Sequence, residues 1–209
     1  MTGVNVWDPT MEWSWNSVTP PSSFNGEDVI AHALHPDGRT LFVSTSYGTT
    51  HFFGTTSNGG VWKELGDWVL PFQGQGHFDA KLDAWVGLHH KEDGYVCCCP
   101  VVSRSVVTTR PPKCKMLQEK LFHRETQEEV PTPTHKHLNT TLVYKGDSRL
   151  CLVDNSMTRH DFKHAVLHVT IFGLKYDHRG HLQTKIRRTV TSYSVSNASA
   201  YFTHPAFWM

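Results

Sequence analysis

Short apolar segments, most of them rich in valine, threonine and aromatic residues, alternate along this chain with turns of glycine, proline, aspartate and asparagine. Segments of this length and composition are typical of β-strands, and the residues between them are those that tight turns favour. The first set has four such segments: Val29–Leu34, Thr40–Thr45, Thr50–Thr55 and Trp62–Leu70. Four strands within about 45 residues predict one β-propeller blade over residues 27–72.

Two further sets of strand-like segments follow. The second is predicted for residues 74–125 and contains Leu82–Leu88, Gly94–Cys99 and, as its outer strand, Met116–Phe122, for which a helical turn is the alternative. The third is predicted for residues 137–197 and contains Thr140–Tyr144, Arg149–Val153, Val166–Tyr176 and Leu182–Val195. The last two of these flank Asp177–Gly180, and a glycine-containing turn between two long strands predicts a β-hairpin.

The two ends of the chain complete the predicted organisation. Residues 1–24 resemble a lone N-terminal outer strand, and residues 198–209 are apolar enough to form a tail that docks on the body. Helical periodicity is nearly absent from the chain. Residues 1–209 are therefore predicted to form one all-β domain of about three four-stranded blades.

Four stretches of the chain resemble a known family. They are Trp62-Lys63-Glu64-Leu65-Gly66-Asp67-Trp68-Val69-Leu70-Pro71-Phe72-Gln73-Gly74, Leu82–Leu88, Gly146–Val153 and Phe172–Tyr176. The chain looks like the uncharacterised, grass-expanded plant proteins with kelch-like or F-box-associated β-propeller domains, over roughly residues 25 to 197. The resemblance implies an incomplete kelch-like propeller that binds proteins, and it supplies no catalytic residues. Family members have more blades, so ring closure is not predicted, and no F-box-like helical segment is present.

Composition limits the classes of partner and the compartment. The formal net charge is +1, so no global field favours nucleic acid or an anionic membrane. No apolar run is long enough to span a membrane, and the first residues lack the features of a signal peptide. The five cysteines, three of them adjacent, do not form a disulfide framework. A cytoplasmic or nuclear location is therefore expected.

Metal, cofactor and enzyme chemistry are not predicted. Within the run Cys97-Cys98-Cys99, only Cys97 and Cys99 share a strand face, and a zinc site would need Cys114 or a histidine as well. Buried, small apolar cysteines are the preferred interpretation. His135 and His137 have the spacing of ligands on one strand face, but histidines in polar segments are commonly just exposed. No nucleophile elbow, zinc-protease, nucleotide-binding or phosphate-loop motif occurs in the sequence.

One basic hairpin, residues 175–188, offers an alternative function. It carries Arg179, Lys185, Arg187 and Arg188, which could form an RNA- or phosphate-binding surface. That hypothesis requires these cations to share a face with tyrosines such as Tyr176, Tyr193 or Tyr201. The low net charge argues against nucleic acid.

The main functional prediction is a non-catalytic protein-interaction or scaffold module, with a protein partner of unknown identity. Its contacts are expected at aromatic residues that stay exposed after folding, namely Trp13, Trp15, Tyr47 and Trp85. Open blade edges would also allow self-association. The remaining alternative is a truncated relative with little activity of its own.

Overall fold

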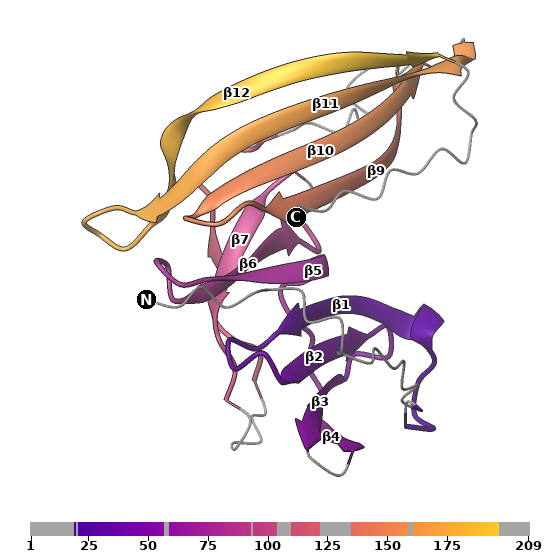
Figure 1. Ribbon diagram of the computed structural model, residues 1–209, viewed down its shortest axis with the longest axis vertical. Helices are drawn as coiled ribbons and strands as arrows, with labels where there is room; N and C mark the ends of the chain where they lie inside the picture. Colours follow the sequence, from indigo (N-terminus) through magenta and orange to yellow (C-terminus); the bar gives the residue numbers. More distant parts are fainter. Residues whose placement is uncertain are drawn as a thin grey trace, which may run out of the picture.

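The computed structural model describes an all-β chain of twelve strands and one short 3-10 turn, Gly26–Asp28. It describes residues 19, 21–56, 59–92, 94–103, 110–121, 135–158 and 161–196. Within these ranges the backbone alone is described at 56, 59, 135–138, 157–158, 161–164, 186–189 and 196. The strands form three successive four-stranded antiparallel meanders, which are stacked along the long axis of the molecule (Figure 1).

The first meander follows the predicted segments closely. Its strands are β1 (Val29–Leu34), β2 (Thr40–Thr45), β3 (Thr50–Thr56) and β4 (Gly59–Gly66). The β1–β2 turn is held by Asp37, whose Oδ1 accepts hydrogen bonds from the backbone N–H groups of Arg39 at 2.8 Å and Thr40 at 3.0 Å. Aspartate commonly closes such turns in this way. Burial opposes ionisation of Asp37, but these hydrogen bonds and the neighbouring His35 lower its pKa to about 2.

The second meander contains a strand that the sequence pattern does not reveal. Its strands are β5 (Phe72–Asp79), β6 (Ala84–His89), β7 (Val96–Pro100) and β8 (Lys115–Met116). β5 was not predicted, because its two internal glycines and its glutamines lack strand propensity. The predicted outer strand Met116–Phe122 overlaps only the two-residue β8, and over its described residues, 116–121, neither a full strand nor a helical turn forms.

β5 forms a strand because it pairs with β1. The two strands run parallel, with Ala31, His32 and Ala33 opposite Gly74, Gln75 and Gly76, and this pairing joins the first two meanders into one eight-stranded sheet. Phe72 fills the space beside the glycines, since a Cβ atom at Gly76 would lie 2.3 Å from its ring and one at Gly87 would lie 2.6 Å from its Cβ. Glycine at 76 and 87 therefore leaves the room that the Phe72 side chain occupies.

The third meander forms a separate four-stranded sheet in the order β12-β11-β10-β9. Its strands are β9 (His135–Tyr144), β10 (Arg149–Thr158), β11 (Asp161–Tyr176) and β12 (Leu182–Ser196). β11 and β12 are joined by the predicted hairpin turn, in which the Gly180 N–H donates to the Asp177 carbonyl oxygen at 3.0 Å. β10 and β11 are longer than the predicted segments Arg149–Val153 and Val166–Tyr176, because their pairing continues to Thr158 opposite Asp161.

The second meander lies between the other two, and alternate side chains of β6 and β7 enter different apolar clusters. Trp85, Cys97 and Cys99 belong to the cluster shared with the first meander, which also contains Ala31, Ala33, Phe42, Leu65, Trp68, Leu70, Phe72 and Val102. Val86, Leu88 and Cys98 belong to the cluster shared with the third, which also contains Leu142, Leu150, Leu152, Phe172, Leu174 and Leu182. The predicted alternation and burial of the three adjacent cysteines are confirmed.

The all-β prediction is therefore confirmed. Each of the two sheets is open and has two edge strands. Within the described ranges, no helix is long and apolar enough to span a membrane.

Candidate anion-binding pocket

A cavity of about 300 Å³ lies where the second meander meets the third. We call it the lysine pocket, and it is lined by Lys81, Leu82, Ser148, Leu174, Lys175, Tyr176 and Lys185. These residues come from the β5–β6 turn, the β9–β10 turn, the end of β11 and the start of β12. Three lysines from distant parts of the sequence thus line one cavity.

Asp79, at the end of β5, holds two walls of the lysine pocket together. It is fully buried, and its Oδ1 accepts hydrogen bonds at 2.9 Å from the backbone N–H groups of Lys81 and Leu82 and from the Ser148 hydroxyl. The first two bonds shape the β5–β6 turn, and the third fixes the β9–β10 turn to it. Three hydrogen bonds thus converge on one carboxylate oxygen and join the two turns.

The β9–β10 turn has an unusual backbone conformation. Gly146, Asp147 and Ser148 all have positive φ values, 85°, 57° and 57°. Left-handed conformations at non-glycine residues are costly and persist where the surroundings hold them. Ser148 is held on two sides, because its hydroxyl donates to Asp79 and its carbonyl oxygen accepts the Leu174 N–H at 2.9 Å.

The charges around the lysine pocket favour an anion. Lys81 Nζ lies 2.9 Å from Asp147 Oδ1, and the two side chains are 56% and 67% exposed. Hydrogen bonding and charge from Lys81 lower the pKa of Asp147, with smaller contributions from Arg149 and Lys185. An exposed ion pair of this kind is worth little, so another carboxylate or phosphate can displace Asp147. Lysine ammonium groups only donate hydrogen bonds and therefore bind anions.

Tyr176 in the pocket wall is already engaged. Its hydroxyl lies 3.3 Å from Cys98 Sγ, and Lys115 Nζ lies 4.4 Å from the centre of its ring. Burial raises the pKa of the Tyr176 hydroxyl, and the hydrogen bond with Cys98 raises it further. Tyr176 therefore stays neutral at physiological pH and contributes shape to the wall.

A further polar contact at this boundary is made by His77. His77 Nε2–H donates to the Leu142 carbonyl oxygen at 2.9 Å, and its ring stacks on Tyr144. Burial lowers the pKa of His77. Burial also raises the pKa of the Tyr144 hydroxyl, and the neighbouring Asp79 carboxylate adds to that rise. The His77 ring and the Tyr144 hydroxyl are therefore uncharged at neutral pH, and the contacts of His77 fasten β5 to β9.

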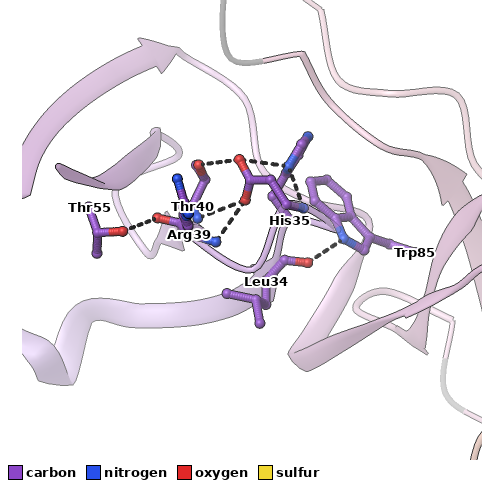
Figure 2. Close-up of polar contacts among 7 residues, drawn as sticks. Leu34, His35, Arg39, Thr40, Thr55 and Trp85 are labelled. Carbon is purple, nitrogen blue, oxygen red and sulfur yellow. Dashed lines mark hydrogen bonds and ion pairs between the residues drawn. The ribbon is translucent and has the colours of Figure 1, made fainter. Parts of the chain in front are cut away.

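The expectation that Trp85 stays exposed for a partner is wrong. Trp85 is fully buried, and its indole N–H donates to the Leu34 carbonyl oxygen at 2.9 Å, next to the Asp37 turn (Figure 2). The sequence did not reveal that β6 is covered on both faces. Tyr47 is 66% exposed in the β2–β3 turn, as expected. Trp13 and Trp15 lie outside the described residues.

Only part of the predicted basic hairpin surface can be placed. Lys185 lines the lysine pocket, whereas Arg179 is exposed in the β11–β12 turn. Arg187 and Arg188 belong to β12, and their side chains lie outside those described. The sequence interpretation missed Lys81 and Ser148, because a lysine and a serine in two separate turns give no signal that they meet.

The predicted metal alternatives gain no site. Among the described residues, no group of three or more histidine, cysteine or acidic side chains is arranged to hold an ion. Cys97 and Cys99 lie in a buried apolar cluster against which Cys114 packs, and the side chains of His135 and His137 lie outside those described. A hydrogen bond with Cys114, together with burial, raises the pKa of the Cys97 thiol, which disfavours the thiolate that a metal would require.

Two comparisons with known proteins bear on the chain. Residues 4–193 match the model of a family described as "Protein of unknown function (DUF1668)". A search of curated proteins found no match.

Proposed function

This chain belongs to the DUF1668 family of proteins of unknown function, and we propose that it is a non-catalytic protein-interaction module whose lysine pocket binds an acidic segment of a partner protein. The observation that carries the proposal is the convergence of Lys81, Lys175 and Lys185 on one cavity. The ion pair between Lys81 and Asp147 supports it, because a carboxylate already binds at the edge of this cavity.

The other polar groups in the pocket wall already have hydrogen-bond partners, which agrees with a role in binding without catalysis. The Ser148 hydroxyl donates to Asp79, and the Tyr176 hydroxyl contacts Cys98. A nucleophile requires a neighbouring base and access to substrate, whereas the Ser148 side chain is buried and bonded to a carboxylate that also binds two backbone N–H groups. These groups support the pocket and leave the lysines to bind.

A protein partner agrees with the structure better than RNA does. Single-stranded RNA binds proteins largely through bases that stack on open aromatic rings. Tyr176, the tyrosine of the lysine pocket, has Lys115 against its ring, and Tyr193 lies near the other end of β12. The formal net charge of +1 also provides little attraction for a polyanion.

The wider arrangement suits an interaction module. We propose that the three meanders are blades of an incomplete kelch-like propeller, since each is an up-and-down meander of four strands and neighbouring meanders pack through apolar clusters. All five cysteines are free thiols, which supports a reducing compartment, either cytosol or nucleus.

Titration with a short fluorescent polyglutamate peptide tests the proposed function. We expect saturable binding, with Lys81→Gln and Lys185→Gln each raising Kd about fivefold, the effect of losing one charge contact of about 1 kcal/mol. Lys63→Gln is the matched control, because Lys63 is an exposed lysine on β4 in the first meander. A polyglutamine peptide of equal length should not bind.

Two results would contradict the proposal. Equal affinity of all three variants for polyglutamate would show that the lysine pocket is not the site. Tighter binding of a single-stranded RNA of similar length, lost in the pocket variants but retained in Lys63→Gln, would favour the nucleic-acid function instead.

A further inference from the structure

β12 is an edge strand of the third meander, and among the described residues most of its outer side has no pairing partner. It extends from Leu182 to Ser196 and is the terminal strand of its sheet. Its ladder runs to β11, and within the described ranges its other edge has one bridge only, at Leu182. An edge strand of this length presents a row of backbone donors and acceptors that another strand can use.

Another segment of the same chain contacts the beginning of the β12 edge. Leu117 forms a parallel bridge with Leu182, and the Thr184 hydroxyl donates to Glu119 Oε1 at 2.7 Å. A cavity of about 190 Å³ lies between the two segments, lined by Leu117, Gln118, Glu119, Gln183 and Thr184. A segment with an acidic side chain therefore already contacts the beginning of β12, through one backbone bridge and one side-chain hydrogen bond.

The next residues of β12 suit a second acidic segment. Lys185 follows Thr184 directly and also lines the lysine pocket, and Arg187 and Arg188 follow on the same strand. From Thr189 to Ser196 the strand contains Thr, Val and Tyr, which favour sheets, alternating in part with three serines. Val190 and Tyr193 are about half exposed, at 49% and 54%, and offer apolar contacts to side chains of an added strand.

We infer that the acidic segment binds as an additional β-strand along β12 between Lys185 and Val195, beyond the positions used by Leu117–Glu119. This inference rests on the proposed function and adds to it the conformation of the partner. Backbone hydrogen bonds to the β12 edge provide affinity, and a carboxylate beside Lys185 provides selectivity. A second copy of this chain fits less well, because its own β12 would bring the same cations to the edge.

N-methylated peptides test the inference separately from the function. The probe is a peptide of alternating glutamate and valine, made with N-methyl groups on all odd or on all even residues. Only alternate N–H groups of an added strand face the edge, so one methylated peptide should bind about a hundredfold more weakly while the other keeps most of its affinity. Hydrogen exchange of the bound complex should show new protection of amides in residues 185–195 and none in β4, the control edge strand.

Each outcome has a distinct meaning. If both methylated peptides bind as well as the parent and the lysine variants still weaken binding, the proposed function stands and the strand-addition inference is overturned. If the parent peptide does not bind, the proposed function fails and the inference fails with it. Protection of 185–195 without peptide, together with a doubled solution mass, would identify a second copy as the occupant and overturn the inference.

Discussion

The two boundaries between the three meanders are built in different ways. The first and second meanders share backbone pairing between β1 and β5, and Trp85 from β6 donates to the backbone of Leu34. The second and third meanders share a single backbone bridge, between Leu117 and Leu182, and are otherwise joined by side chains, among them His77 to the Leu142 carbonyl oxygen and Asp79 to Ser148. Both boundaries also contain an apolar cluster.

This difference explains where the lysine pocket occurs. Parallel strands with small residues approach closely, and the rings of Trp85 and Phe42 fill the space beside them, with centroids 5.1 Å apart. At the second boundary two turns meet through side chains, Asp79 with Ser148 and Lys81 with Asp147, and the space beside these contacts is lined by lysines. A boundary formed by side chains can leave a polar cavity that a backbone-paired boundary closes.

The largest expected effect is at the first boundary. Trp85→Ala should lower the free energy of unfolding by about 4 kcal/mol, since it removes a fully buried ring. Trp85→Phe should cost about 1 kcal/mol for the lost hydrogen bond to Leu34. Urea unfolding measures both, with Tyr47→Ala as the exposed aromatic control. A Trp85→Ala cost as small as that of Tyr47→Ala would contradict the buried, structural role of Trp85.

A somewhat smaller effect is expected at the second boundary. Asp79→Ala should cost about 3 kcal/mol, because two backbone N–H groups and the Ser148 hydroxyl lose their acceptor. Asp79→Asn keeps an acceptor oxygen and should cost less. Asp67→Ala is the control, since Asp67 is exposed in the loop between β4 and β5 and should change stability by less than about 0.5 kcal/mol. Equal costs for Asp79→Ala and Asp67→Ala would show that the boundary does not depend on this joint.

The smallest effect concerns pH. Burial lowers the pKa of His77 below its usual 6.5, so the unfolded chain binds more protons than the folded one once pH falls below that value. Stability should therefore decrease on acidification from about pH 7 to about pH 5. His77→Gln keeps a donor for Leu142 and should reduce this decrease. The substitution should not abolish the decrease in stability, because burial also lowers the pKa values of His32, His51 and His89.

Urea unfolding at both pH values measures this prediction. A decrease that is unchanged in His77→Gln would show that His77 titrates alike in the folded and unfolded chains. In that case His77 would not make the boundary between the second and third meanders sensitive to pH.

Local structure could be predicted from the sequence, and contacts between distant residues could not. The Asp37 turn and the β11–β12 hairpin depend on residues within a few positions of one another, and both form where the pattern predicts them. β5 escaped prediction because its partner β1 lies about 40 residues away, and its glycines are favourable only beside Phe72 and β1.

The same limit applies to the candidate site. Lys185 was predicted as a binding residue from its basic neighbours, but Lys81 and Ser148 are 67 residues apart and meet through one buried aspartate. Trp85 was assigned to an exposed contact because a strand pattern does not reveal that both of its faces are covered. Aromatic content in such a chain therefore predicts a core more reliably than a binding surface.

The most direct test of the central claim is lysine footprinting, in which acetylation of each lysine is measured by mass spectrometry with and without saturating polyglutamate peptide. The account predicts that Lys81, Lys175 and Lys185 become protected together while Lys63 reacts at its original rate. Uniform protection of all lysines, or protection that leaves these three unchanged, would contradict the assignment of the lysine pocket as the binding site.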